Sequence, residues 1–165
     1  YYKMAADKGA VDSMYILGSK FEKGDGIEED KIYAAKYYQM GVDHEDAPSM
    51  YRLALLKKDG IGVPLDKTGS AELFKMAAEK GHTQSMASYG NMLLNGDGVE
   101  EDEDEADHYY RMAIEKGDLD AMTDYGVILY KGEGVSPNQK EGMNLIKRAA
   151  EKGHKGAKSQ LKKLK

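Results

Sequence analysis

The sequence predicts an all-α protein, a solenoid of helix pairs that repeat every 36 residues. One observation is a glycine loop that occurs four times at this interval. Another is a gap-free alignment of the segments that begin at residues 1, 37, 73 and 109. The third is the helical spacing of small and apolar residues within each unit. The loops are GDGIEED from residue 24, GIGVPLD from 60, GDGVEED from 96 and GEGVSPN from 132.

The first helix of each unit, named helix A, follows the i, i+3, i+4, i+7 rule of a helix with one buried face. A glycine inside a helix costs about 1 kcal/mol relative to alanine. Its recurrence at the third of these positions therefore indicates close approach of a second helix. The four sets are Met14, Leu17, Gly18 and Phe21; Met50, Leu53, Ala54 and Lys57; Met86, Tyr89, Gly90 and Leu93; and Met122, Tyr125, Gly126 and Leu129.

The second helix, named helix B, carries its own apolar positions, among them Tyr37 and Tyr38 in one copy and Leu73 and Phe74 in the next. Each helix A is expected to end at a left-handed glycine, and each helix B to begin at an N-cap side chain. Helix B then ends at a further glycine. The A-ending glycines are Gly24, Gly60, Gly96 and Gly132, the N-caps are Asp30, Asp66, Asp102 and Asn138, and the B-ending glycines are Gly9, Gly81, Gly117 and Gly153.

The glycine loops resemble ion-binding or phosphate-binding loops only superficially. Their acidic residues vary between copies, whereas the glycines and one aliphatic residue do not. No ordered calcium-ligand pattern is present, and no Gly-Lys-Ser/Thr follows the glycine pairs. We therefore interpret the loops as structural connections from helix A to helix B. Their aliphatic residues, expected to point inward, are Ile27, Val63, Val99 and Val135.

The segment AMTDYGVILYKGEGV at residues 121–135, with RAAEKG following from residue 148, resembles the Sel-1-like repeat family, relatives of tetratricopeptide repeats. The Leu/Tyr-Gly pair, the Gly-x-Gly-Val loop and the Ala-Ala-x-x-Gly ending recur together along nearly the whole chain. The resemblance implies antiparallel helix pairs stacked in a right-handed α-α superhelix, and an adaptor that gathers other proteins. Some bacterial members carry a disulfide in every repeat, but this chain has no cysteine.

The repeats predict a single domain over residues 1–165. Residues 1–9 are the end of a truncated unit, full units cover 10–45, 46–81, 82–117 and 118–153, and residues 154–165 form a C-terminal capping helix. The second unit departs from the pattern, with Glu45 in place of the B-ending glycine, Ala54 in place of the A-helix glycine and Lys57 at a large apolar position.

Composition narrows the function classes. The chain has 165 residues, 41% of them hydrophobic, and a formal net charge of −5, which gives no general reason to expect nucleic-acid binding or membrane insertion. Without cysteine there is no disulfide or thiolate metal site, and the compartment stays open, with the cytoplasm as a guess and a lost upstream signal peptide as the alternative. The four histidines lack metal-site spacing, so we expect no metal, cofactor or catalytic residue.

We therefore predict a non-enzymatic scaffold that binds a protein or peptide in a concave groove lined by the A helices. The alternatives are a structural spacer in a longer array and, from another class, a hydrolase-type enzyme. By analogy with tetratricopeptide repeats, the groove residues are expected to be Tyr15, Ser19, Tyr51, Leu55, Asn91, Leu94, Asn95, Tyr130 and Lys131. Packing of the apolar members between helices is an equally weighted alternative.

The two ends of the chain carry further expectations. Tyr1, Tyr2, Met4 and Ala5 occupy helix B positions whose helix A is absent, so we expect weak self-association through this end. Residues 144–165 hold eight lysine or arginine residues against one glutamate. We favour a polar cap there over a site for an acidic partner, a head-to-tail contact or a membrane-surface helix.

Overall fold

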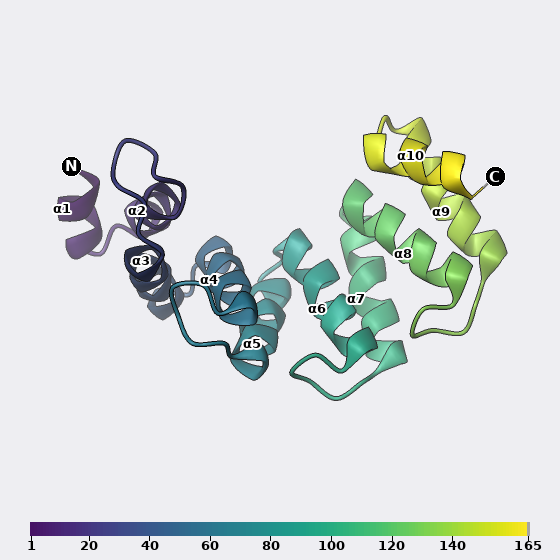
Figure 1. Ribbon diagram of the computed structural model, residues 1–165, viewed down its shortest axis with the longest axis horizontal. Coiled ribbons are helices and arrows are strands. Elements are labelled where there is room, and N and C mark those ends of the chain that lie inside the picture. Colours follow the sequence, from purple (N-terminus) through teal and green to yellow (C-terminus); the bar gives the residue numbers. More distant parts are fainter. Residues whose placement is uncertain (165) are drawn as a thin grey trace. The chain divides into compact units, whose positions relative to one another are not determined.

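The computed structural model describes residues 1–164 and contains ten helices in that range (Figure 1). The B helices are α1, α3, α5, α7 and α9, and the A helices are α2, α4, α6, α8 and α10. The fold class is therefore confirmed: an all-α solenoid of 36-residue helix pairs. The bounds are α1 Tyr2–Asp7, α2 Val11–Lys23, α3 Lys31–Asp43, α4 Ala47–Asp59, α5 Lys67–Glu79, α6 Thr83–Asn95, α7 Glu103–Glu115, α8 Leu119–Lys131, α9 Gln139–Glu151 and α10 Lys155–Lys163.

The chain divides into two compact units, residues 1–85 and residues from 86 onward. In the first unit α1 packs on α2, α2 on α3, α3 on α4 and α4 on α5. Its first core cluster joins Ala6, Met14, Leu17 and Tyr37, with Phe21 stacked on Tyr37 at a ring-centroid distance of 5.7 Å. Each A helix therefore buries one face against the B helices before and after it in the chain.

The second unit repeats this arrangement. There α7 packs on α8, α8 on α9, and α10 on both α8 and α9. Tyr110 of α7 stacks on Tyr125 of α8, with ring centroids 4.7 Å apart, and both rings are almost fully buried. Ile146 of α9 and Leu129 of α8 are also buried. The aromatic and branched side chains predicted as apolar positions thus form the core.

The glycine inside helix A makes room for a side chain of helix B. A Cβ atom built on Gly18 would lie 2.6 Å from Cε1 of Tyr38, and one built on Gly90 would lie 2.9 Å from Cδ2 of Tyr110. Overpacking of this kind costs about 1–3 kcal/mol, as much as or more than the roughly 1 kcal/mol that alanine gains over glycine in a helix. The close helix–helix approach predicted from the repeated glycine is confirmed.

The connections also have the predicted caps. Gly24, Gly60, Gly96 and Gly132 lie in the left-handed region, with φ from 61° to 73°. The carboxylate of Asp30 accepts hydrogen bonds from the amides of Ile32 and Tyr33 at the start of α3. The N-cap side chains of α5, α7 and α9 accept from helix amides in the same way; they belong to Asp66, Asp102 and Asn138.

Each of these N-cap residues also ties its loop back to the preceding A helix. The amide of Asp30 donates to the carbonyl of Phe21 at 2.9 Å. Because the same bond recurs in every loop, it fixes how the chain turns from helix A into helix B. We call it the loop hydrogen bond. The other three are Asp66 N to Lys57 O at 2.9 Å, Asp102 N to Leu93 O at 3.1 Å, and Asn138 N to Leu129 O at 2.8 Å.

The prediction that every loop aliphatic residue points inward is wrong for Ile27, which is exposed, whereas Val135 is buried. The reason lies in the preceding repeat. A Cβ built on Gly134 would lie 3.0 Å from the carbonyl oxygen of Leu94, so this loop packs against an earlier A helix. A Cβ on Gly26 would meet nothing within 4 Å, so no other segment of residues 1–164 lies against this glycine. Ile27 beside it is accordingly 36% exposed.

The N-terminal helix exposes the side chains that the repeat places there. Tyr1 is 96% exposed and Met4 64% exposed, while Tyr2 is also exposed and Ala5 is half-buried. Ala6 alone of this helix is buried. The weak self-association through this end stays a prediction.

Glu45 occupies a backbone position that glycine fills in the other repeats. Its φ is 59°, the one positive φ of a non-glycine residue among residues 1–164. A left-handed conformation costs about 1–2 kcal/mol for a residue with a Cβ. Its carboxylate pairs with Lys80 across the ends of α3 and α5, Nζ to Oε2 at 2.8 Å. The replacement of glycine by Glu45 therefore produces a strained turn, and the side chain at this turn forms an exposed ion pair.

We predict that Glu45→Gly raises the thermal midpoint by about 2–4 °C, because the turn loses its strain. Glu45→Gln is the matched control, since it removes the charge that pairs with Lys80 but keeps the Cβ. Circular dichroism during heating measures both variants. Equal midpoints for the two variants would contradict the strain at this turn.

Candidate interaction surfaces

The first unit contains a hollow of about 500 Å³ on the side formed by its A helices. Its walls come from the first two turns of α2, the start of α4 and the residue before α6. We call it the A-face hollow. Its lining residues are Asp12, Tyr15, Ile16, Asp46, Pro48 and His82.

Tyr15 is the one predicted groove residue that lines this hollow. Its ring lies 5.9 Å from that of Tyr38, and its side chain is half-buried. Tyr51 lies next to the hollow rather than in its lining: its ring packs on His82, with centroids 4.8 Å apart, and on Phe74 at 5.7 Å. The other two groove candidates of this unit, Ser19 and Leu55, are half-buried and do not line it.

A half-buried carboxylate close to this surface joins three helices. The hydroxyl of Tyr38 on α3 donates to Oε2 of Glu22 on α2 at 2.6 Å, and Nε of Arg52 on α4 donates to the same oxygen at 3.1 Å. Burial raises the pKa of Glu22, but the hydrogen bonds from Arg52 and Tyr38 and the charge of Arg52 outweigh it and hold that pKa below its ordinary value. The ring against which Tyr15 rests is thereby held in place.

His82 has a structural role that the sequence did not indicate. His82 precedes α6, and the amide of Ser85 donates to its Nδ1 at 3.3 Å. His154 does the same for α10, where the amide of Ala157 donates to Nδ1 at 3.2 Å. Only a ring nitrogen without a proton can accept, so this geometry requires Nδ1 to be unprotonated. Both side chains act as N-caps.

In the second unit the predicted groove residues differ in exposure. Asn91 and Asn95 are exposed, one turn apart on α6, and Nδ2 of Asn95 donates to the carbonyl of Asn91 at 2.7 Å. Burial raises the pKa of Tyr110 to about 12, and a hydrogen bond with Asn91 partly offsets the rise. Leu94 is only 8% exposed and lies against Gly134 in the loop before α9.

The two remaining candidates lie at the end of α8. Tyr130 is half-buried, and its backbone packs against α9, where a Cβ on Gly142 would lie 2.7 Å from its amide nitrogen. Lys131 is exposed and pairs with Glu133 at 3.1 Å. Asn91, Asn95 and Lys131 therefore offer polar groups to solvent, whereas Leu94 belongs to the packing between repeats.

The residues that sequence reasoning missed lie at the start of the A helices. The predicted groove residues begin at Tyr15 on α2 and at Tyr51 on α4, and they do not include Asp12, Ile16 and Pro48. Asp12 precedes Tyr15 by three residues, on the same helix face, and this spacing was the available signal. Asp46 was visible as an N-cap type of residue, and its carboxylate does accept from the amide of Ser49 at 2.9 Å.

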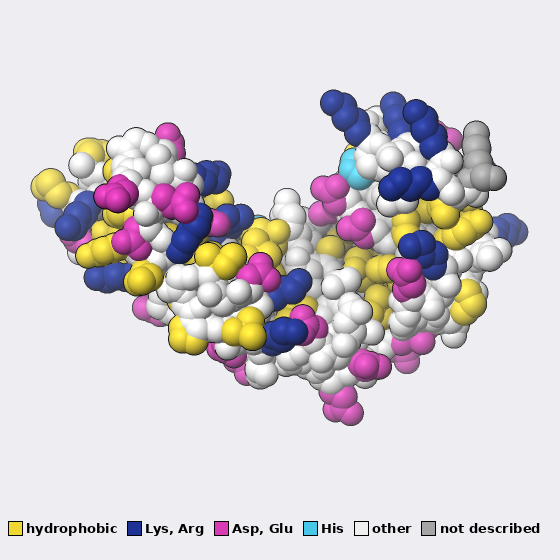
Figure 2. Space-filling model, in the orientation of Figure 1, with side chains coloured by type: hydrophobic (Ala, Val, Ile, Leu, Met, Phe, Trp, Pro, Cys, Tyr) yellow, Lys and Arg dark blue, Asp and Glu magenta, His cyan; other side chains and the backbone are white. Residues whose placement is uncertain are grey.

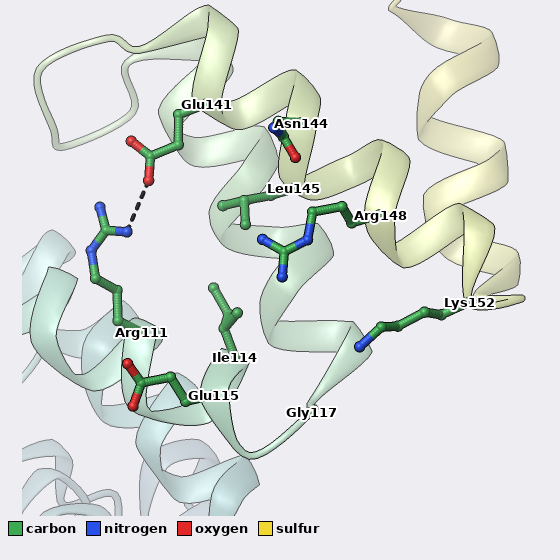
Figure 3. Close-up of a pocket in the computed structure, with 9 residues that line it drawn as sticks. All are labelled: Arg111, Ile114, Glu115, Gly117, Glu141, Asn144, Leu145, Arg148 and Lys152. Carbon is green, nitrogen blue, oxygen red and sulfur yellow. Dashed lines mark hydrogen bonds and ion pairs between the residues drawn. The ribbon is translucent and has the colours of Figure 1, made fainter.

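A second hollow lies in the second unit, between the B helices α7 and α9 (Figure 3). We call it the α7–α9 pocket, and its volume is about 510 Å³. No sequence signal pointed to it, because it is formed by side chains from successive repeats. Its lining residues are Arg111, Ile114, Glu115, Gly117, Glu141, Asn144, Leu145, Arg148 and Lys152.

The basic end of the chain also gathers on one surface. Figure 2 shows lysine and arginine side chains over α10, with apolar side chains beside them over α9. Ala157 is the buried residue of α10, and Leu161 is half-buried. Among residues 1–164, no helix is long and apolar enough to cross a membrane. No three or more His, Asp or Glu side chains in that range are grouped to hold a metal ion.

These features define a class of protein, an α-solenoid of repeated helix pairs. The Sel1 repeat model matches residues 11–46, 47–82, 83–118 and 119–154, so the chain belongs to the Sel1 repeat family. Proteins of this family are generally interaction scaffolds, and the fold is typically non-enzymatic. No curated protein matches the chain.

Solved structures agree with this assignment. A Sel1 repeat protein from Oxalobacter formigenes is 28% identical with a TM-score of 0.86, over 94% of this chain and 62% of that one. A protective antigen from uropathogenic Escherichia coli with the same fold is 28% identical with a TM-score of 0.84, over 92% of this chain and 32% of that one. The chain therefore spans about a third of the antigen and less than two thirds of the Oxalobacter protein.

An immunity protein from Pseudomonas aeruginosa shares the fold alone. It is 18% identical with a TM-score of 0.64, over 94% of this chain and 58% of that one.

We predict that acidification weakens the first unit through His82. Burial lowers its pKa below the ordinary value of 6.5, and the charge of Asp46 opposes this only in part. The unfolded chain therefore binds a proton at higher pH than the folded chain. Stability is full above about pH 6.5 and falls as the pH drops toward the lower folded pKa. Urea unfolding at a series of pH values measures this.

His82→Asn tests this assignment, because asparagine can cap a helix but does not titrate in this range. In this variant the loss of stability just below pH 6.5 should shrink. His108→Gln, at an exposed histidine of α7, is the control and should leave the profile unchanged. Identical pH profiles for the parent chain and His82→Asn would show that His82 does not cause the loss.

Proposed function

We propose that this chain is a protein-interaction scaffold whose A helices hold a segment of a partner protein. The observation that carries the proposal is the A-face hollow, in which the half-buried ring of Tyr15 lies between polar groups. Tyrosine combines a large apolar surface with a hydroxyl that can remain wet, which suits a surface that binds a peptide. The scaffold role that is general in the family supports this proposal.

The charges of the hollow favour one kind of segment. Asp12 and Asp46 contribute carboxylates, whereas no lysine or arginine of residues 1–164 lines the hollow. Ile16 and Pro48 add apolar surface beside them. A lysine or arginine next to an apolar residue complements this combination, because the cation can meet the carboxylates while the apolar side chain covers Ile16.

In the second unit the proposed contacts are the exposed amides of Asn91 and Asn95, with Tyr130 and Lys131 on the next A helix. An asparagine side chain offers both a donor and an acceptor to a peptide backbone. Leu94 contributes to the shape of this surface rather than to contact, because it is buried. In the first unit Ser19, Tyr51 and Leu55 extend the proposed contact surface beyond the hollow.

We predict that a photo-crosslinker at Tyr15 captures a partner protein in cells that make this chain. p-Benzoylphenylalanine in place of Tyr15 keeps an aromatic ring in the hollow and reacts only with groups in contact. The matched control carries the same residue at Lys36, an exposed position of α3. Adducts should form at Tyr15 and be absent at Lys36, as identified by mass spectrometry. Equal adducts at both positions, or none at either, would favour a structural spacer.

We predict that the double variant Asn91→Ala, Asn95→Ala weakens capture of that same partner while the fold is kept. A buried hydrogen-bonding group that loses its counterpart costs about 1–3 kcal/mol. Both side chains already hydrogen-bond within the free chain, Asn91 with Tyr110 and Asn95 with the carbonyl of Asn91, so the loss should lie toward the lower end of this range. Binding is measured by calorimetry with the purified partner. Undiminished affinity in a folded double variant would remove α6 from the binding surface.

A further inference from the structure

The α7–α9 pocket has the chemistry of a second binding site, on the B helices rather than the A helices. Arg111, Ile114 and Glu115 come from α7, and Glu141, Asn144, Leu145 and Arg148 come from α9, whereas Gly117 and Lys152 follow these helices. Figure 3 shows Arg111 and Glu141 on one side of the pocket and Arg148 and Lys152 on the other. The proposed function does not use these residues.

The cations of the pocket differ in whether the protein already neutralises them. Arg111 donates through Nη1 to Glu141 at 2.8 Å and through Nε to Asp107 at 2.8 Å, so its charge is used within the fold. Arg148 and Lys152 form no hydrogen bond or ion pair through their side chains with any residue in the range 1–164. Arg148 lies in the last turn of α9, and Lys152 is the C-cap of this helix. Because the two residues are four positions apart, they lie on the same face of the helix. Two neighbouring cations are thus available to a ligand.

The space between the two sides offers apolar surface and open backbone. Ile114 is half-buried and presents part of its side chain, whereas Leu145 is only 5% exposed and contributes to the shape of the pocket. Figure 3 shows Ile114 and Leu145 between the two charged sides. Gly117 has φ +87°, and a Cβ built on it would meet nothing within 4 Å, which leaves its backbone accessible. A ligand there can bury an aliphatic group beside a charge.

The charge balance of the pocket selects a monoanion. Because Arg111 is already paired with Asp107 and Glu141, the open charges of the lining are the cations Arg148 and Lys152 and the carboxylate of Glu115, which leaves a single net positive charge. A carboxylate matches this charge, whereas a phosphate dianion carries one negative charge more than the lining neutralises. The guanidinium fork of Arg148 also suits the two oxygens of a carboxylate.

We propose that the α7–α9 pocket binds an acidic side chain of a partner protein, with an aliphatic residue next to it in the sequence. The carboxylate meets Arg148 and Lys152, and the aliphatic side chain covers Ile114. The Asn144 amide is placed to hydrogen-bond the peptide backbone. The chain then carries two recognition surfaces of opposite charge preference, the A-face hollow for a cation and this pocket for an anion.

The probe is the capped peptide acetyl-Gly-Glu-Leu-Gly-amide, titrated at millimolar concentration into the isotope-labelled chain and followed by amide chemical shifts. We expect shifts confined to residues of the pocket, and weaker binding at higher salt because the site is partly exposed. Arg148→Gln and Lys152→Gln should each weaken binding about two- to fivefold. The matched control is Lys147→Gln, which removes the same charge from the neighbouring exposed position of α9 and should leave binding unchanged.

Three further ligands test which feature of the peptide the pocket recognises. Acetyl-Gly-Gln-Leu-Gly-amide, which lacks the carboxylate, should shift no pocket resonance. The same glutamine peptide with a free C-terminus tests whether the pocket binds the terminal carboxylate of a chain. If it binds as tightly as the glutamate peptide, the ligand is not specifically an internal acidic residue. Inorganic phosphate should bind more weakly than the peptide. The site would be refuted if the glutamate peptide caused no shifts. It would also be refuted if Arg148→Gln, Lys152→Gln and Lys147→Gln all bound that peptide equally well.

Discussion

Within each repeat the two helices cross where a small residue on helix A faces a large side chain on helix B. Gly18 faces Tyr38 and Gly90 faces Tyr110, and neither pair has space for another carbon atom. This close approach sets the distance between helices A and B. It also places the Tyr38 hydroxyl where it can donate to Glu22, so the packing of the repeat and its hydrogen-bond network depend on the same crossing.

Much of the fold could be predicted because its determinants are local. The left-handed turn at Gly24 and the N-cap at Asp30 each depend on residues within a few positions of them, and each recurs at a fixed interval. The prediction that Ile27 is buried was wrong because burial of a loop side chain depends on the preceding repeat. The position within one unit does not encode that contact. The capping role of His82 was not predicted, because a histidine N-cap has no strong sequence signal.

The candidate sites were less predictable for a related reason. Tyr15 could be selected from the phase of α2, since outward positions follow from the helical period. The A-face hollow also needs Pro48 and His82, which lie far from Tyr15 in the sequence and line the same hollow only in the folded first unit. The α7–α9 pocket depends similarly on Arg148. The three-dimensional contacts show that Glu141 pairs with Arg111, which leaves the charge of Arg148 open to a ligand.

The loop hydrogen bond has a consequence for how the chain responds to mechanical force. The bond from Asp30 to Phe21, like each of its three counterparts, spans nine residues and lies inside one repeat. Because solenoid repeats contact mainly their neighbours, tension applied along the chain is resisted locally rather than by one central core. A helix pair closed by such a bond can detach as a unit while the next pair stays folded. Extension would then proceed in steps of one repeat.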